Sequence, residues 1–203
     1  MVQFEALPRV FYEPSALRVA PELLGHFLLR RTAEGVCGGP IVETEAYLSE
    51  DPACHGFGGP TARNRVMFGA PGHGYVYLIY GLHFCVNAVC RPTGVAEAVL
   101  VRAIEPVFGL EILRRHRCVP NSRQLTNGPA KLCEAMNITR TLDGIDLCAP
   151  NSPIFIARNP DLKGYRKVHG PIITTTRIGI TQAAAMPLRF YLGGSDYVSR
   201  RIR

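Results

Sequence analysis

The chain has 203 residues, a mass of 22.3 kDa and a hydrophobic content of 47%, which together favour one folded domain over a disordered chain. Its formal charge is +7, and of its 23 basic residues only Lys131, Lys163 and Lys167 are lysines, which leaves 20 arginines. Because arginine grips phosphate with a planar fork, this balance fits nucleic-acid binding, and it fits equally well a charge that serves only solubility.

Cysteine spacing and the first residues bear on the compartment. Seven cysteines include no Cys-x-x-Cys pair, so we expect reduced thiols rather than a disulfide framework or a zinc site. The start, MVQFEALPRVFYEP, carries acidic residues and prolines where a signal peptide needs a basic start and an apolar run. No apolar run approaches membrane-spanning length. The sequence therefore predicts a soluble cytoplasmic protein without a metal or other cofactor.

The first half of the chain predicts one helix and two strands before a long loop. Ser15–Leu24 reads as a short helix, or as two turns broken at Pro21. Phe27–Arg31 reads as a strand, and a second strand follows over residues 40–48. From Ser49 to Gly74 the chain is rich in Gly, Pro and polar residues, which is typical of a functional loop.

A hairpin is predicted in 75-YVYLIYGLHFCVN-87. Two apolar runs, Tyr75–Ile79 and Leu82–Val86, meet at Tyr80-Gly81. A hairpin tip is usually polar, so a tyrosine at this turn places a large ring where water would meet it.

The rest of the chain completes a mixed α/β fold with an antiparallel core. The expected elements are a buried strand at the centre of 95–106, a helix over 107–117, a helix from Gly128-Pro129 through Met136, and strands at Ile172–Ile180 and Leu188–Leu192. We see neither an internal repeat nor a linker, so a single domain over residues 1–203 is expected.

Four side chains indicate a flat binding slot. In 40-PIVETEAYL-48, strand alternation places Glu45 and Tyr47 on one face, about 7 Å apart. Tyr75 and Tyr77 share a face of the hairpin, and Tyr77 would form the wall opposite Tyr47. Such a slot suits a flat, electron-poor guest and holds a cationic ring more tightly than a neutral one. The alternatives are an exposed polar face for the first pair and an aromatic core strand for the second.

Arg102 lies in 98-AVLVRAI-104, a run that is otherwise apolar. A charge in such a setting needs a partner, and a carboxylate is the natural one. If Glu45 is that partner, Arg102 favours its ionised form and keeps it a base near neutral pH. An ordinary structural ion pair is the alternative.

Three further positions have both a functional and a structural interpretation. Arg63 and Arg65, in 61-TARNRVMFG-69, suit phosphate contacts but can also be plain surface charges. His55 can line the slot or cap its loop. Asn87 can bond a guest or simply end the second hairpin strand.

Six segments, in order along nearly the whole chain, closely resemble the alkyladenine (3-methylpurine) DNA glycosylase family, in its bacterial type. They are 41-IVETEAYL-48, 63-RNRVMF-68, 75-YVYLIYGLHFCVN-87, 100-LVRAIEP-106, 128-GPAKLC-133 and 187-PLRFY-191. The resemblance implies a curved sheet with a protruding hairpin. It also implies a base-excision repair enzyme that flips a damaged purine from duplex DNA and hydrolyses its N-glycosidic bond.

The resemblance also implies roles for single residues. Glu45 would be the general base for the attacking water, which Arg102 and the main-chain carbonyl of Ile178 help to hold. The remaining pocket roles fall to Tyr47 and Tyr77 as the rings that sandwich the flipped base, His55 at the pocket edge, and Asn87 against the exocyclic amine of guanine. Between Tyr47 and His55 the chain is one residue shorter than in animal relatives.

The same resemblance assigns Tyr80 as the wedge that fills the gap left in the base stack. Leu82 and His83 stand beside it, where animal members have Met and Tyr. Arg63, Arg65 and Lys131 would hold flanking phosphates of double-stranded DNA that carries alkylated or deaminated purines. We expect a monomer that associates with the nucleoid through this binding.

The expected mechanism is monofunctional. Strand cleavage through a Schiff base needs an amine nucleophile, and the three lysines lie outside the slot. Two other classes stay open: a non-catalytic module that binds damaged DNA or structured RNA, and an enzyme that acts on a methylated nucleoside or a tRNA-bound group.

Overall fold

An antiparallel sheet of eight strands forms the centre of the structure, a computed structural model that describes residues 4–202. The two ends of the domain expected over 1–203, residues 1–3 and 203, lie outside the described residues. The strands are β1 (Phe27–Thr32), β2 (Gly35–Tyr47), β3 (Gly74–Ile79), β4 (His83–Cys90), β5 (Glu97–Ile104), β6 (Ile154–Ala157), β7 (Ile172–Thr175) and β8 (Arg189–Leu192). The helices are α1 (Ala16–Leu23), α2 (Leu110–His116), α3 (Pro129–Ala135) and α4 (Leu162–Val168), with 3-10 turns at η1 (Arg9–Tyr12), η2 (Arg65–Phe68), η3 (Ser122–Gln124) and η4 (Arg140–Leu142).

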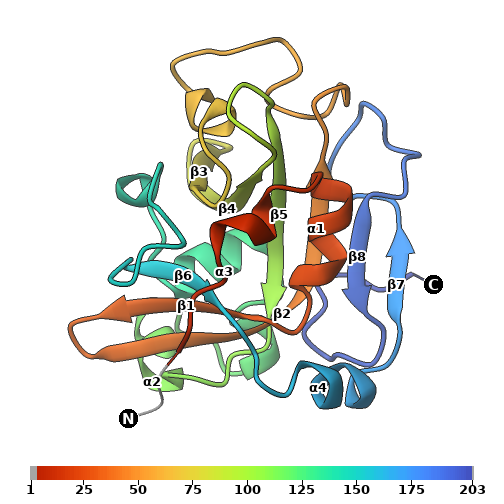
Figure 1. The fold of residues 1–203 in the computed structure, drawn as a ribbon. Helices are drawn as coiled ribbons and strands as arrows, with labels where there is room; N and C mark the ends of the chain where they lie inside the picture. The colour runs from red at the N-terminus through yellow and green to blue at the C-terminus, as the bar shows by residue number, and fades with distance from the viewer. Residues whose placement is uncertain (1–3, 203) are drawn as a thin grey trace.

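Strand β2 joins the two halves of the sheet. The strand order is β3-β4-β5-β2-β1-β6, and β8 pairs with both β2 and β7 (Figure 1). The first part of β2 pairs with β1, whereas residues 41–47 pair with β5 and residues 43–45 also pair with β8. Register shifts around Glu43 accompany this change of partners, and such irregularities bend a strand. The sheet is therefore curled, and the predicted mixed α/β fold with a curved antiparallel core is confirmed.

Two glycines in β2 allow this close packing. A Cβ on Gly38 would lie 2.1 Å from the carbonyl oxygen of Leu28, and one on Gly39 would lie 1.9 Å from that of Glu105. Only a residue without a side chain fits between such close backbones. The β1–β2 hairpin that these glycines permit was not predicted, because the sequence interpretation began the second strand at Pro40.

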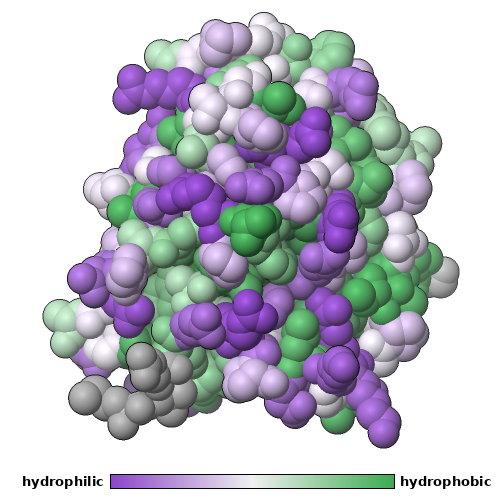
Figure 2. Space-filling view, in the orientation of Figure 1, coloured by the Kyte–Doolittle hydropathy of each residue, from purple (hydrophilic) through white to green (hydrophobic). Residues whose placement is uncertain are grey.

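Helices α1 and α3 pack on the central strands. The buried face of α1 is formed by Ala16, Val19, Ala20 and Leu23, and the helix crosses β2 and β5 (Figure 1). Pro21 lies in its last turn and does not break it. Helix α3 packs against β4 and β5. Polar residues dominate the face of the molecule in Figure 2, with small apolar groups scattered among them.

Two sequence predictions about elements are corrected, and two elements were missed. The strand expected over Ile172–Ile180 ends at Thr175, and the next residues form a loop. The second hairpin strand runs to Cys90, because its last residues pair with β5, so Asn87 lies inside the strand and does not end it. Strand β6 and helix α4 were not predicted.

The hairpin between β3 and β4 has the predicted exposed ring at its tip. Ile79 pairs with His83, which leaves a three-residue turn between them. Within it, Tyr80 and Gly81 have φ values of 52° and 70°, in the left-handed region. Tyr80 is 83% exposed, so the fold leaves this ring free of packing.

Across residues 4–202, no helix is both long and apolar enough to cross a membrane. Within that same range, no group of three or more His, Cys, Asp or Glu side chains is arranged to hold a metal ion.

Candidate active site

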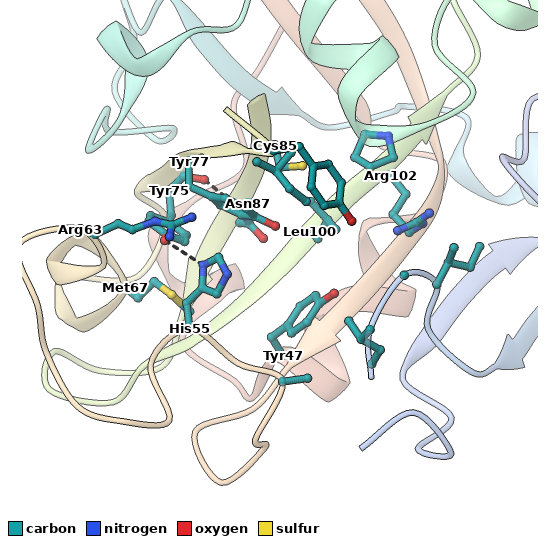
Figure 3. A pocket seen from close by; sticks show the side chains of 17 residues that line it. Tyr47, His55, Arg63, Met67, Tyr75, Tyr77, Cys85, Asn87, Leu100 and Arg102 are labelled. Atoms are coloured by element: carbon teal, nitrogen blue, oxygen red, sulfur yellow. Dashed lines mark hydrogen bonds between the residues drawn. The ribbon is translucent and has the colours of Figure 1, made fainter. Parts of the chain in front are cut away.

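A cavity of about 340 Å³ opens between the end of β2, the β3–β4 hairpin and the loop after β7 (Figure 3). This volume lies within the range of small-molecule sites, about 300–1,000 Å³. The residues that line it combine aromatic, polar and basic side chains with apolar ones. They include Tyr47, His55, Arg63, Tyr75, Tyr77, Tyr80, Cys85, Asn87, Arg102 and Ile178. Nine of the predicted site residues thus meet around one cavity.

Glu45 lies behind the wall of this cavity with no exposed surface. Its Oε1 accepts a hydrogen bond from the backbone N–H of Ile178 at 2.8 Å. Its Oε2 accepts one from the hydroxyl of Tyr47 at 3.0 Å and lies 3.2 Å from Nη1 of Arg102. All three donor residues line the cavity, so the carboxylate is held directly beneath its surface. The hydrogen bond to Tyr47 confirms that both residues share a face of β2.

Arg102 pairs with two carboxylates. Besides Glu45, its Nε donates to Oε1 of Glu43 at 3.0 Å. Glu43 also accepts from Nε of Arg189 at 2.8 Å and from the backbone N–H and hydroxyl of Ser199 at 2.7 and 2.8 Å. The predicted pairing of Arg102 with Glu45 is present, but Glu43 is a second partner that sequence reasoning did not identify.

Burial sets the protonation of the site. Desolvation raises the pKa of the Glu45 carboxyl, and Arg102, the Ile178 amide and the Tyr47 hydroxyl lower it without cancelling that effect. Arg102 thus acts in the predicted direction but does not dominate. Burial also raises the pKa of Tyr47 and Tyr77, so both phenols stay neutral near pH 7. A neutral ring keeps its apolar faces available for stacking.

The aromatic walls are arranged as a slot. Figure 3 shows Tyr47 on one side of the cavity and Tyr75, Tyr77 and His55 grouped on the other. The rings of Tyr75 and Tyr77 stack with centroids 5.3 Å apart, and that of His55 meets Tyr77 edge-on at 4.5 Å. Nδ1 of His55 is 3.0 Å from the Tyr75 hydroxyl. His55 therefore lies at the slot despite the shorter loop that leads to it.

The electrostatics of His55 and the placement of Asn87 also follow from this packing. Desolvation and the nearby charge of Arg63 lower the pKa of His55, which favours the neutral ring. Asn87 donates from Nδ2 to the carbonyl of Tyr75 at 3.0 Å and lines the cavity. Its side chain is thus fixed by the hairpin that presents the aromatic rings.

Of the residues expected to meet a nucleic acid, Tyr80 and Arg63 line the cavity, and the others lie outside it. Leu82 is 73% exposed beside Tyr80, and His83 is exposed as well. Arg63 and Arg65 are exposed, and Arg63 also donates to the carbonyl of Leu78. Basic and apolar groups therefore surround the mouth of the slot.

Lys131 is less exposed than these side chains. It is half-buried at the start of α3, and its Nζ donates to Oδ1 of Asn127 at 2.9 Å. Along residues 4–202, the cavity lining includes no lysine.

Two features of the site were missed by sequence reasoning. One is the second carboxylate, Glu43, whose position two residues before Glu45 on an alternating strand was an available signal. The other is a buried ion pair between Arg177 and Asp51, with the Arg177 guanidinium 4.6 Å from the ring centre of Tyr47. Neither residue carries a local pattern that predicts this contact.

Comparison with known proteins places the chain among DNA repair enzymes. A family model described as methylpurine-DNA glycosylase matches residues 10–196. A protein of Methanoculleus marisnigri is 50% identical over 198 residues, covering 96% of this chain and 99% of its own length. Proteins of Carboxydothermus hydrogenoformans and Nitrosospira multiformis are 46% and 44% identical, covering 96% and 97% of this chain and 99% and 95% of their own. All three are provisionally named 3-methyladenine DNA glycosylase.

Proposed function

Because the chain belongs to the methylpurine-DNA glycosylase family and is a hydrolase of N-glycosyl bonds, we propose that it removes 3-methyladenine and related alkylated purines from duplex DNA. The observation that carries the proposal is the buried Glu45 carboxylate, held by three donors whose residues line an aromatic cavity. The slot receives the flipped base, and the carboxylate acts at its sugar.

The shape and charge of the slot suit an alkylated purine. Tyr47 and Tyr77 present neutral ring faces, which attract the positive charge of a base such as 3-methyladenine. Asn87 is anchored to the hairpin backbone, so its side chain resists displacement by the exocyclic amine of guanine. His55 closes the edge of the slot.

In the proposed reaction, the water oxygen bonds to C1′ of the sugar and Glu45 takes its proton. The N-glycosidic bond breaks with its electron pair passing to the base, which leaves neutral if it was cationic. A carboxylate offers about four acceptor sites. The three donors use one on Oε1 and two on Oε2, so an acceptor position is left for the water on Oε1. Arg102 and the carbonyl of Ile178 also position that water.

The hairpin tip and the basic side chains around it form the DNA-binding face of the proposal. Tyr80 enters the base stack as a wedge, with Leu82 and His83 beside it. Arg63 and Arg65 contact flanking phosphates and fix position without reading sequence. Lys131 takes part only if it leaves its bond to Asn127.

The product is an intact strand with an abasic site. Opening the sugar as a Schiff base needs an amine, and the cavity lining of the described residues offers no lysine. A single chain supplies every residue of the proposed site, so a monomer suffices.

The test is a panel of duplexes that carry 3-methyladenine, 7-methylguanine, hypoxanthine or ethenoadenine, incubated with the unmodified protein and with Glu45→Gln. We expect release of free base by the unmodified protein, cleavage of the strand only after alkali, and loss of release but not of binding in Glu45→Gln. Glu111→Gln, a carboxylate that is 81% exposed on α2, serves as the matched control. Equal release by Glu45→Gln and the unmodified protein would refute the assigned base, and release of none of the four bases would refute the proposed substrates.

A further inference from the structure

Arg177 is buried directly behind the slot and does not line it. Its Nη1 donates to the carbonyl of Ala46 at 3.1 Å and to the carboxylate of Asp51, and neither charged side chain has exposed surface. Its guanidinium centre lies 4.6 Å from the ring centroid of Tyr47. One side chain thus touches the backbone before Tyr47, the ring of Tyr47 and the loop that follows it.

The next residue along the chain is Ile178, whose N–H donates to Glu45. Ile178 belongs to the loop that replaces the last part of the predicted strand after β7. Gly179, with φ 78°, follows it and lines the cavity. The side chain of Arg177 is therefore the anchor that ties this loop to β2 at the level of the carboxylate.

Stability alone is a poor reason for this arrangement. Nε and Nη2 of Arg177 are buried without a hydrogen-bond partner among the described residues. Burying an ion pair with unpartnered N–H groups is costly, and apolar residues of similar volume often replace such a pair without loss of stability. A functional constraint on the geometry of the site accounts better for a guanidinium at this position.

We propose that Arg177 is a positioning residue of the glycosylase, which holds the Tyr47 ring and the Ile178 amide in register with the Glu45 carboxylate through its ion pair with Asp51. The inference rests on the proposed function. Two of the three donors to Glu45, the Tyr47 hydroxyl and the Ile178 N–H, depend on this anchor. The third donor is Arg102, which lies on the neighbouring strand β5.

The planar group matters as well as the charge. A guanidinium over one face of Tyr47 fixes the plane of the ring, so the opposite face meets the flipped base at a set angle. A lysine at position 177 would keep the positive charge but would lose the planar group over the Tyr47 ring. Arg177→Lys and the unmodified protein therefore have the same charge at this position, and any difference in their activity reports the geometry of the group.

Loss of the Arg177 anchor should raise the pKa of Glu45. The bond from Ile178 lowers the pKa of Glu45, so its loss leaves the carboxyl with a higher pKa than in the unmodified protein. Base release needs the ionised carboxylate. The acidic limb of the pH–rate profile, which is the fall in the rate of base release at low pH, therefore moves to higher pH. A residue that only supports folding would not move that limb.

The test uses Arg177→Met, Arg177→Lys and Asp51→Asn, each assayed for single-turnover base release between pH 5 and 9 and for binding to a duplex that carries an abasic-site analogue. We expect a rate constant lowered by about tenfold or more, since misplacement of a catalytic group by about 1 Å can cost about 10²-fold. The acidic limb should shift to higher pH, and binding should change by less than about twofold. The matched control is Arg166→Met. It removes contacts to the carbonyls of Pro21, Glu22 and Leu24, none of which lines the cavity, and should leave the acidic limb in place.

The outcomes separate the two proposals. Unchanged rates and limbs in folded Arg177→Met, or in Arg177→Lys and Asp51→Asn where the methionine variant does not fold, overturn the positioning role. A shift of the limb in Arg166→Met of the same size also overturns it. Failure of the unmodified protein to release any base overturns the proposed function instead.

Discussion

Glu43 and Glu45 lie two residues apart on β2, have no exposed surface, and share the guanidinium of Arg102. Their environments differ in one respect. Glu43 accepts four hydrogen bonds from Arg102, Arg189 and Ser199, three on Oε1 and one on Oε2, and of these partners only Arg102 lines the cavity. Glu45 keeps an acceptor position on Oε1 and adjoins the cavity. The first carboxylate is thus a structural anchor for the guanidinium, and the second is the one with capacity to take a proton.

Glu43→Gln is expected to destabilise the fold. The substitution removes the negative charge between two buried guanidinium groups, and removal of one partner from a buried ion pair costs about 3–5 kcal/mol. Urea unfolding at pH 7 measures the loss. Glu111→Gln, at an exposed carboxylate of α2, should change the free energy of unfolding by less than about 0.5 kcal/mol. Equal unfolding midpoints for Glu43→Gln and this control would contradict the anchoring role.

The rate of base release should fall in acid with an apparent pKa above the ordinary value for glutamate, about 4.3. Glu45 acts in its ionised form, and burial raises its pKa, so protons remove the base at a higher pH than in an exposed glutamate. Single-turnover release from pH 4 to 8 measures the limb. Any residual release by Glu45→Gln should lack it, and a limb of equal shape in that variant would assign the titration to another group.

The same raised pKa predicts how stability depends on pH. A carboxyl whose folded-state pKa lies above its unfolded-state value contributes stability that is fully present below the unfolded value and is lost as pH rises through the folded value. The free energy of unfolding of the unmodified protein, minus that of Glu45→Gln, should therefore become more positive from pH 8 towards pH 4. Other titrating groups are common to both proteins and cancel. A difference that shrinks as pH falls would show that the pKa of Glu45 is lowered instead.

Tyr80→Gly should separate wedge action from folding. The ring is 83% exposed and the residue has φ 52°, a conformation that costs a residue with a side chain about 1–2 kcal/mol and glycine far less. We expect unchanged or slightly higher stability, together with slower base release from fully paired duplex. Release from a lesion in an unpaired bulge should suffer less, because that base is already unstacked. Equal losses on both substrates would argue against a wedge.

Local patterns account for the parts of the site that the sequence predicted. Alternation in β2 places Glu45 beside Tyr47, and the apolar runs around Tyr80 predict a hairpin with an exposed tip. Each of these relations spans a few residues, so periodicity alone determines it.

The parts that were missed depend on distant contacts. The strand expected to reach Ile180 ends at Thr175, which pairs with Arg189 at the start of β8, and the N–H of Ile178 donates instead to Glu45, 133 residues before it. Glu43 meets Ser199, 156 residues away, and β4 extends past Asn87 because β5 continues the pairing. Such contacts override local preference, and the contacts of Glu45 and Glu43 join residues too far apart for one window of sequence to contain both.

Arg65→Ala should weaken DNA binding without affecting sequence preference. Arg65 is exposed at the start of η2, beside the loop that borders the slot, and no carboxylate of the described residues pairs with it. A phosphate contact releases counterions, so loss of one arginine should reduce the slope of log K against log salt concentration by about 1. Titration of duplexes of different sequence from 50 to 200 mM salt measures this slope. Arg114→Ala, whose side chain is paired with Glu111 on α2, should leave the slope unchanged. Equal slopes for Arg65→Ala and the unmodified protein would remove Arg65 from the DNA-binding face, whereas a loss confined to one duplex sequence would mean that it contacts a base.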